Sequence, residues 1–336
     1  MSTAHIDVNV IDFEMLGAWM DGQGLPGGPI GEVAPVLGGT QNVMVRFSRG
    51  GVPYILRRPP LHARARSNEV LRREARVLAA LRGTDVPAPA LVAAQTADEP
   101  VFYLMEPVDG FNATTGLPEP HASDPAIRYR MGLEATSALA ALGRVPAAAL
   151  PDFGRPEGFL ERQVPRWLSE LESYGRLDGY PGPAIPHLAE TADWLERNRP
   201  AAFTPGIMHG DYHLANLMFA PDGPRVAAIV DWEMCTIGDP LLDLGWLLAT
   251  WPDDDGPGPH QVDGLPSRAE IVAYYTELSD RDLSAVDWYA VMACFKLGIV
   301  LEGTHARACA GQAPKDIGDL LHATTLNLFA RARTYM

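Results

Sequence analysis

The sequence predicts an α+β fold of two lobes, with a small antiparallel sheet in the N-terminal lobe and a mostly helical C-terminal lobe. The chain has 336 residues, which is longer than a single hydrophobic core usually grows. Segments with strand-like alternation concentrate before residue 106, whereas apolar residues at helical spacing dominate after it. We therefore expect one lobe over residues 1–106 and a second over residues 107–336.

The N-terminal lobe is expected to contain a helix, a small sheet and a second helix. Asp12 can cap the first helix, because its side chain can accept a hydrogen bond from an amide of the first turn. Runs that alternate with period two and carry β-branched residues predict the strands. The expected strands are residues 43–47, 52–58, 90–94 and 101–105, and the expected second helix is residues 68–81.

The C-terminal lobe is expected to be mostly helical, because apolar residues recur there at helical spacing. The predicted helices are residues 127–142, 160–174, 188–198, 267–278, 285–300 and 317–333. Breaker-rich loops are expected over residues 179–186 and 252–266. The second loop contains the acidic run 253–255, which is either a solvated surface or the border of a site for a cationic acceptor.

Composition excludes several classes of protein. A hydrophobic content of 47% and a charged content of 21% are typical of soluble globular proteins. Neither a secretory signal nor an apolar stretch of membrane-spanning length is present, so a cytoplasmic location is expected. The formal net charge of −15 argues against nucleic acid or an anionic membrane as a partner. Three cysteines without CxxC spacing indicate reduced thiols, not a disulfide frame or a zinc site.

Residues 209–216, which read HGDYHLAN, are the most informative stretch of the chain. An apolar run over residues 226–230 follows and ends at a second acid, Asp231. Phosphoryl transfer needs a carboxylate to orient the attacking hydroxyl, and oxygen ligands that hold Mg²⁺ on the nucleotide phosphates. Asp211 can be the first, and Asn216 and Asp231 can be the second. Kinase catalytic loops have this spacing; the alternative is a polar loop beside a core strand.

Together with the Gly238-Asp239-Pro240 turn and Asp243, this pattern resembles the aminoglycoside phosphotransferase and choline kinase-like family. Its members are small-molecule kinases that share the protein-kinase fold. The resemblance extends from about residue 37 to residue 244. It implies a nucleotide-binding N-terminal lobe and a C-terminal lobe that carries the catalytic and substrate-binding residues.

The resemblance places a phosphate-binding loop at Gly39, Thr40 and Asn42. Glycines between strands let the backbone approach phosphates closely, and the two polar side chains can donate hydrogen bonds to them. An ordinary hairpin turn explains these residues equally well.

The lysine that grips nucleotide phosphates in the kinase fold is missing from this chain, whose only lysines are Lys296 and Lys315. Arg57 occupies the matching position, and Arg58 is the alternative on the opposite face of the same strand. Glu74 lies within the apolar stripe of the following helix, where a carboxylate is costly unless a cation meets it. We expect Glu74 to pair with Arg57; pairing with a neighbouring arginine at the rim is the alternative.

The segment that begins at Glu106 resembles the interlobe hinge of the family. Pro107 has no N–H, so the carbonyl of Glu106 and the N–H of Val108 are the pair available to adenine. Phe102 and Met105 are expected to form an apolar wall for the base.

Three further acids and one histidine lie close to the catalytic loop in sequence. His209 is expected to support the loop structurally. Asp239 and Asp243 are expected to cap backbone amides around His209 and not to bind metal. Glu233 can touch a second metal ion or point away from it.

The sequence thus predicts a Mg²⁺-dependent phosphotransferase that uses ATP, or GTP, to phosphorylate a hydroxyl of a small molecule. An aminoglycoside-like or choline-like acceptor fits the family. The stretch LRRPP at residues 56–60 resembles the kinase-like domains associated with acyl-CoA dehydrogenases, which implies a hydroxy acid or hydroxyacyl thioester instead. The alternative function is a catalytically silent nucleotide-binding or scaffold protein, and the missing lysine is the observation that favours it.

Overall fold

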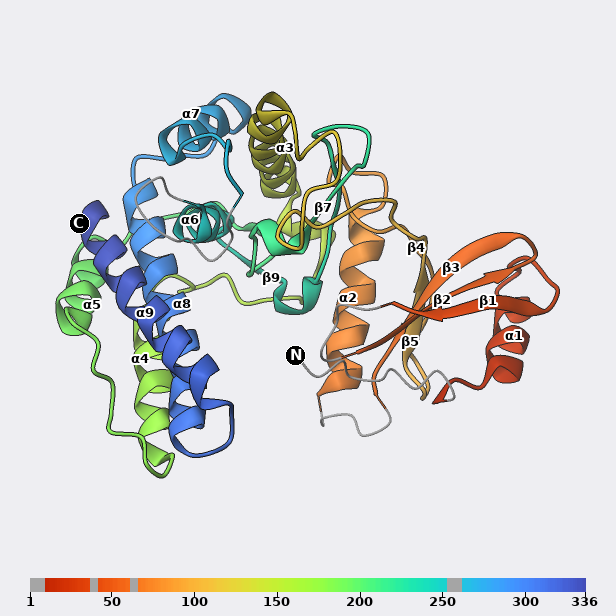
Figure 1. Ribbon diagram of the computed structural model, residues 1–336, viewed down its shortest axis with the longest axis horizontal. Helices are drawn as coiled ribbons and strands as arrows, with labels where there is room; N and C mark the ends of the chain where they lie inside the picture. The colour runs from red at the N-terminus through yellow and green to blue at the C-terminus, as the bar shows by residue number, and fades with distance from the viewer. Residues whose placement is uncertain (1–9, 37–41, 61–65, 253–261) are drawn as a thin grey trace. The chain divides into compact units, whose positions relative to one another are not determined.

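The computed structural model describes residues 10–36, 42–60, 66–252 and 262–336. The chain forms two compact units (Figure 1). Met1–Gly110 and Ala227–Glu233 make up the first, and Phe111–Val226 and Met234–Met336 make up the second. The expected lobe boundary between residues 106 and 107 stays a prediction.

An antiparallel five-stranded sheet with the order β1-β2-β3-β5-β4 is the centre of the first unit. Its strands are β1 (Ile30–Pro35), β2 (Val43–Arg49), β3 (Val52–Arg58), β4 (Leu91–Gln95) and β5 (Phe102–Met105). Strand β1 was not predicted, because glycine and proline interrupt the alternation of its sequence, IGEVAP. The central strand β3 places Arg57 opposite Met44 on one side and Tyr103 on the other.

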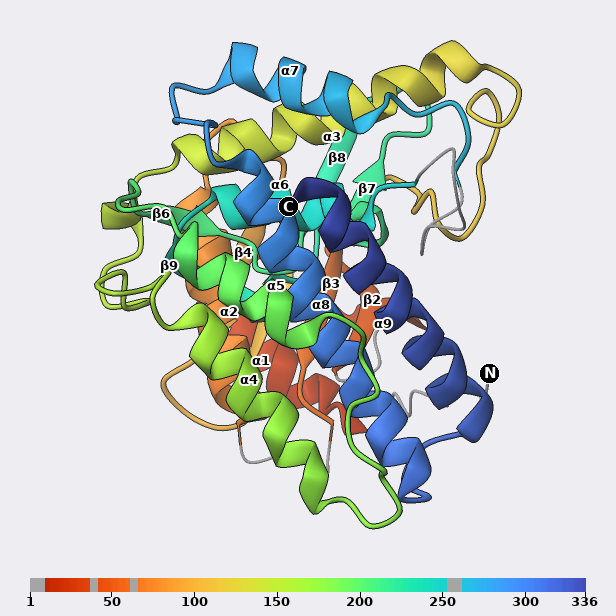
Figure 2. The same cartoon turned by 90° about the vertical axis from the view of Figure 1, so that its left-hand side faces the viewer.

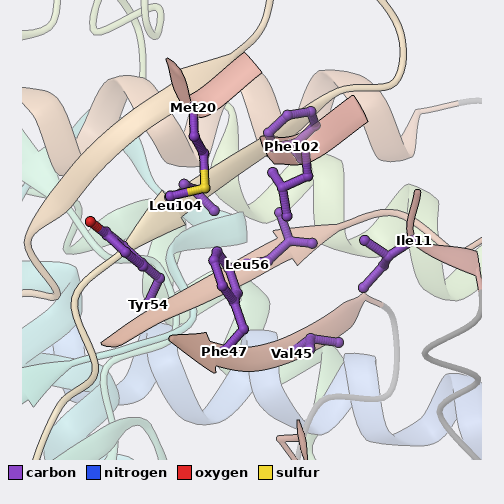
Figure 3. Packing of buried hydrophobic residues seen from close by; sticks show 9 residues of the cluster. Ile11, Met20, Val45, Phe47, Tyr54, Leu56, Phe102 and Leu104 are labelled. Atoms are coloured by element: carbon purple, nitrogen blue, oxygen red, sulfur yellow. The ribbon is translucent and has the colours of Figure 1, made fainter. Parts of the chain in front are cut away.

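Helices α1 (Phe13–Gly22) and α2 (Ser67–Leu81) cover opposite faces of this sheet. The Asp12 side chain caps α1, as predicted, by accepting a hydrogen bond of 2.9 Å from the Met15 amide. The α1 face is closed by an apolar cluster shown in Figure 3, whose buried members are Ile11, Leu16, Met20, Val45, Phe47, Tyr54, Leu56, Phe102 and Leu104. Because successive residues of a strand point to opposite faces, Arg57 and Tyr103 point toward α2.

The second unit consists mainly of helices, with short strands that carry the loops between them. The helices are α3 (Pro125–Arg144), α4 (Gln163–Ser173), α5 (Leu188–Arg197), α6 (Leu241–Thr250), α7 (Arg268–Leu278), α8 (Val286–Cys309) and α9 (Lys315–Tyr335). The strands are β6 (Gly206–Met208), β7 (Leu217–Phe219), β8 (Val226–Ile229), whose last three residues belong to the first unit, and β9 (Thr236–Gly238). Helices α4, α5, α6 and α9 all pack against α8 (Figure 2).

Helix α8 is longer than the sequence predicted. The apolar pattern ends near Val300, but the helix continues to Cys309. Glu302, in this extension, is buried, and its carboxylate contacts Tyr180 in the loop before α5 and His322 on α9. Helix α6 was not predicted as a helix, because it is apolar on nearly all sides and has no amphipathic period. Within the described ranges, every helix is too short or too polar to cross a membrane.

Candidate active site

The catalytic loop begins with a turn that requires glycine. Strand β6 pairs with β9 in antiparallel register and ends at Met208, directly before His209 and Gly210. Gly210 has a φ of +86°, and a Cβ placed on it would lie 2.6 Å from the Met234 carbonyl oxygen. A side chain at this position would therefore meet both backbone strain and a steric clash.

Asp243, in the first turn of α6, holds the backbone turn at His209 and Gly210. Its Oδ2 accepts a hydrogen bond of 2.5 Å from the His209 amide, and its Oδ1 accepts one of 2.8 Å from the Gly210 amide. Burial raises the pKa of the Asp243 carboxyl to about 7, while the two amide donors act in the opposite direction. The prediction that Asp243 caps the backbone around His209 is confirmed.

Asp239 lies just before α6 and caps the start of this helix. It accepts a hydrogen bond of 3.1 Å from the Leu241 amide and one of 2.5 Å from the Tyr289 hydroxyl. Its predicted role as a cap is confirmed at the start of α6 and not at the loop around His209, and the bond from Tyr289 ties this end of α6 to α8.

Asp211 presents a carboxylate held by two neighbours. The Asn216 amide nitrogen lies 3.0 Å from Asp211 Oδ2, and His213 Nε2 lies 3.3 Å from the same oxygen. Burial alone would raise the pKa of Asp211, but the hydrogen bond from His213 and the charges of His213, His209 and Lys296 lower this pKa to about 2. Asp211 is therefore ionised at neutral pH, and 34% of its side chain stays exposed.

Asn216 closes the loop through its amide nitrogen, which also donates to the Asp211 backbone carbonyl at 2.9 Å. Sequence reasoning paired Asp211 with Asn216 through their spacing alone, and the structure brings both side chains together. With Nδ2 directed to Asp211, the amide oxygen of Asn216 is the atom suited to a metal ion.

Asn112 was missed by sequence reasoning. Its amide nitrogen donates to the carbonyl of Ala215 at 2.6 Å and lies within 3.4 Å of two further carbonyl oxygens of the loop, those of Leu214 and Leu217. Its own amide oxygen accepts a hydrogen bond of 2.9 Å from the Thr114 amide. No local pattern identifies it, because its partners lie about a hundred residues away in the sequence.

Lys296 was noted only as one of two lysines, but it lies directly beneath the catalytic loop. Its Nζ donates to the Gly210 carbonyl at 3.0 Å and lies 4.3 Å from the centre of the Trp246 ring and 5.6 Å from that of Trp167. Burial lowers the pKa of Lys296 to about 8, although the charges of Asp211 and Asp243 oppose this shift. The aromatic faces favour the charged form of the amine.

In the first unit, the expected ion pair between Arg57 and Glu74 is present. Arg57 Nη2 lies 2.9 Å from Glu74 Oε1, and the Tyr103 hydroxyl donates to Glu74 Oε2 at 3.0 Å. Burial raises the pKa of Glu74 to about 6, while the charge of Arg57 and the Tyr103 bond lower it. Tyr103 was missed by sequence reasoning. Arg58, the alternative, does not pair with Glu74 and donates instead to the Val10 carbonyl at 2.6 Å.

Asp231 completes a cluster of carboxylates in the first unit. Asp231 Oδ1 lies 3.8 Å from Arg57 Nη2, and ligand oxygens of Glu74, Asp231 and Glu233 lie within 4.8 Å of one another. Asp231 has a φ of +66°, a conformation that is rare outside glycine and common at functional sites. Its side chain is 44% exposed and thus accessible to a ligand.

The hinge backbone is available for a ligand. Among the described residues, neither the Glu106 carbonyl nor the Val108 N–H has a hydrogen-bond partner in the protein, and the Glu106 N–H is bound to the Ala90 carbonyl at 2.9 Å. The expectation for Phe102 is wrong, because its ring is buried in the α1-facing cluster (Figure 3). The centre of this ring lies 4.7 Å from the Trp19 ring centre. Strand alternation places Phe102 on the face away from Arg57.

The other predicted phosphate-binding residues are only partly described. Gly39 and Thr40 lie outside the described residues, as does the acidic run 253–255. Asn42 directly precedes β2 and is half-buried, and its contact with phosphate stays a prediction.

Comparison with known proteins identifies the family. The family model described as "Phosphotransferase enzyme family" matches residues 32–278. The chain belongs to this family. It is 28% identical over 294 residues to acyl-CoA dehydrogenase family member 11 of Pongo abelii, and 26% identical over 274 residues to acyl-CoA dehydrogenase family member 10 of Mus musculus. These matches cover 83% and 77% of this chain but 37% and 25% of the relatives, so the chain spans about a third or less of their length.

Solved structures confirm the two-lobed α+β fold of the protein-kinase type. A Ralstonia eutropha protein named provisionally as an aminoglycoside phosphotransferase is 29% identical, with a TM-score of 0.80 over 96% of this chain and 98% of that one. The GDP complex of aminoglycoside 2'-phosphotransferase-IIIa is 14% identical, with a TM-score of 0.64 over 96% and 99% of the two chains. The predicted family and its resemblance to the acyl-CoA-dehydrogenase-associated branch are thus confirmed. The assigned roles of individual site residues stay predictions.

Proposed function

We propose that this phosphotransferase moves the γ-phosphate of a nucleoside triphosphate, ATP in the first instance, to a hydroxyl group of a small molecule. The observation that carries the proposal is the arrangement of Asp211 and Asn216, in which an ionised, partly exposed carboxylate is fixed on a rigid loop. Such a carboxylate suits a reaction in which the protein mainly positions groups.

Asp211 would accept a hydrogen bond from the acceptor hydroxyl and aim its oxygen at the phosphorus. A carboxylate with a pKa of about 2 is a weak base at neutral pH. Its contribution is therefore orientation, and it takes the proton only as the new oxygen–phosphorus bond forms.

The carboxylates of Asp231 and Glu233, in the first unit, are hard oxygen donors of the kind that suits Mg²⁺. The amide oxygen of Asn216, in the second unit, is a donor of the same kind. The fit is supported in the first unit, where Glu74 and Asp231 pair with one guanidinium and Glu233 lies beside them, so that a further cation would balance the charge of the three carboxylates. When bound, Mg²⁺ supplies charge neutralisation on the phosphates. Arg57, paired with the Glu74 carboxylate that the Tyr103 hydroxyl also contacts, would contact phosphate oxygens. The Glu106 carbonyl and Val108 N–H would receive the base.

For the acceptor, we propose a hydroxy acid or its acyl thioester in place of an aminoglycoside-like or choline-like cation. The ammonium group of Lys296 lies against the loop that carries Asp211 and favours an acceptor with negative charge or a polarised carbonyl. The curated relatives named as acyl-CoA dehydrogenases support the same choice.

The test is transfer of radiolabelled γ-phosphate from ATP, and in parallel from GTP, with Mg²⁺. The acceptors are an aminoglycoside, choline, short-chain hydroxy acids and their coenzyme A thioesters. We expect labelled product with the hydroxy acid or thioester group. Transfer only to the aminoglycoside or to choline would overturn the proposed acceptor and keep the phosphotransferase.

The second candidate, a catalytically silent nucleotide-binding protein, is favoured by the arginine in place of the lysine on β3. It predicts Mg²⁺-dependent nucleotide binding by calorimetry without phosphate transfer to any acceptor of the panel. Labelled product with any acceptor would exclude it.

A further inference from the structure

A second group of metal-ligating side chains lies in the hairpin of α8 and α9, which pack side by side (Figure 2). Glu302, His305 and Cys309 follow one another on α8 at spacings of three and four residues, so they share one face of the helix. His322 projects from α9 toward this face. None of these residues belongs to the catalytic loop or to the carboxylate cluster around Asp231.

The side chains already converge. Glu302 Oε2 lies 2.7 Å from His322 Nδ1, and the rings of His305 and His322 stack with centres 4.5 Å apart. Ligand atoms of Glu302, His305 and His322 all lie within 4.8 Å of one another. Cys309 Sγ lies 3.6 Å from His305 Nε2. Tetrahedral zinc places its ligand atoms about 3.3–3.8 Å apart, so small side-chain rotations are sufficient.

The surroundings of the cluster support a cation. Glu302 is fully buried, and the Tyr180 hydroxyl donates to its Oε1 at 2.7 Å, which leaves Oε2 directed at the histidines. Such a bond from an outer residue orients a metal-ligating carboxylate. His305 Nδ1 is buried and has no hydrogen-bond partner among the described residues. Asp319 Oδ1 lies 3.9 Å from this nitrogen, and the other oxygen of Asp319 is paired with Lys315.

We propose that Glu302, His305 and His322 bind a zinc ion, with Cys309 as the fourth ligand. Imidazole, thiolate and carboxylate are the ligand types of zinc, whereas Mg²⁺ prefers oxygen alone. The ion would join α8 to α9 and stabilise the hairpin. From their spacing, the cysteines were predicted to be reduced thiols. The site was missed because its ligands come from two helices and Cys309 has no CxxC partner.

The test uses tag-free, chelator-treated protein titrated with zinc against a competing chromophoric chelator. We expect one tightly bound zinc ion per chain, and at least a tenfold loss of affinity in His322→Ala and in Glu302→Gln. His187→Ala is the matched control, because His187 is exposed on the same unit and also pairs with a glutamate, at 2.9 Å. The control should bind zinc as the parent does.

Asp231→Ala separates this site from the proposed magnesium site, because zinc can also bind carboxylates. If zinc binding is lost in Asp231→Ala and unchanged in His322→Ala, the proposal is overturned. His305→Gln is the second variant in case His322→Ala fails to fold, and circular dichroism checks the fold of each.

Cobalt substitution tests the ligand set directly. Bound Co²⁺ should give the intense visible bands of a tetrahedral site and, with Cys309, a near-ultraviolet thiolate charge-transfer band that Cys309→Ser removes. Visible bands without the charge-transfer band would overturn the role of Cys309, and weak six-coordinate bands would overturn the site. Zinc should also raise the Tm of the parent protein, and not that of His322→Ala.

Discussion

At the scale of single residues, two carboxylates have opposite environments. Asp211 is surrounded by hydrogen-bond donors and positive charge, and its pKa is about 2. The Glu74 side chain is only 1% exposed, and burial raises its pKa to about 6 despite contact with Arg57. The Asp211 carboxylate is suited to binding a substrate group, and the Glu74 carboxylate to holding the Arg57 side chain in place.

Asp211→Asn is expected to reduce phosphate transfer by about 10²–10⁴-fold, because the amide cannot accept the hydroxyl proton and orients the hydroxyl poorly. Nucleotide affinity should change little, since the carboxylate acts on the acceptor. The measurements are turnover with the acceptor that the panel identifies and nucleotide Kd by calorimetry. Asp222→Asn, at an exposed turn of the same unit, is the control. Unchanged turnover in Asp211→Asn would remove this residue from the mechanism.

Arg57→Ala is expected to weaken binding of ATP far more than binding of adenosine, because only the triphosphate contacts the guanidinium. Arg57→Lys should recover part of the loss, since the charge stays and the bidentate fork is lost. Glu74→Gln should act in the same direction with a smaller effect. In the double variant Arg57→Ala/Glu74→Gln, the loss of ATP affinity should be clearly smaller than the sum of the losses in the two single variants, as expected for coupled residues.

Arg58→Ala is the matched control for this cycle, because Arg58 contacts the Val10 carbonyl on the opposite face of the sheet. A larger loss in Arg58→Ala than in Arg57→Ala would show that the wrong arginine was chosen. Equal losses for adenosine and ATP would indicate a disturbed first unit instead.

At the scale of elements, the catalytic loop depends on contacts from two helices and one loop segment. The first turn of α6 fixes its amides through Asp243, and α8 fixes the Gly210 carbonyl through Lys296. The segment before α3 holds the end of the loop through Asn112. The loop is therefore restrained at both ends by backbone hydrogen bonds from side chains that are distant in sequence.

The lysine of α8 predicts a dependence of stability on pH. Its pKa is about 8 in the folded protein and about 10.4 when unfolded, so between these values the unfolded chain binds more protons. The free energy of unfolding must then rise with pH in this window because of Lys296. Relative to Lys296→Met, we expect the parent to gain about 2 kcal/mol between pH 7 and pH 10.

Urea denaturation at several pH values measures this difference. Lys315→Met is the matched control, because Lys315 is the other lysine of the chain and its side chain is 82% exposed. A difference between parent and Lys296→Met that does not change with pH would contradict the lowered pKa of Lys296.

At the scale of the whole molecule, nucleotide binding should be visible as a gain in stability. A ligand that binds only the folded protein raises the free energy of unfolding by RT ln(1 + [L]/Kd), which is about 2.7 kcal/mol at a hundredfold excess over Kd. We expect ATP with Mg²⁺ to raise the Tm more than ATP with a chelator.

Asp231→Ala should abolish this difference between the two conditions, because the phosphates lose a ligand of their bridging cation. The protein variant should still respond to ATP alone. A Mg²⁺ enhancement of equal size in the variant and the parent would exclude Asp231 as a ligand.

Much of the fold could be predicted from the sequence, because strands β2 to β5 and most helices have clear periodicity. The pairing of Arg57 with Glu74 could also be predicted, since a glutamate in an apolar stripe needs a cation. Strand β1 and helix α6 could not, because one lacks alternation and the other lacks a polar face. Tyr103, Asn112 and Lys296 were missed because their partners come from distant segments.

The arginine on β3 also affects how this protein can be detected. Reagents that carry a nucleotide and acylate the nearby lysine of a kinase need an amine, and residues 1–295 contain no lysine side chain. A guanidinium stays protonated and does not react with them. Chemical surveys that label active kinases through this amine are therefore expected to pass over this protein, even if it binds nucleotide fully.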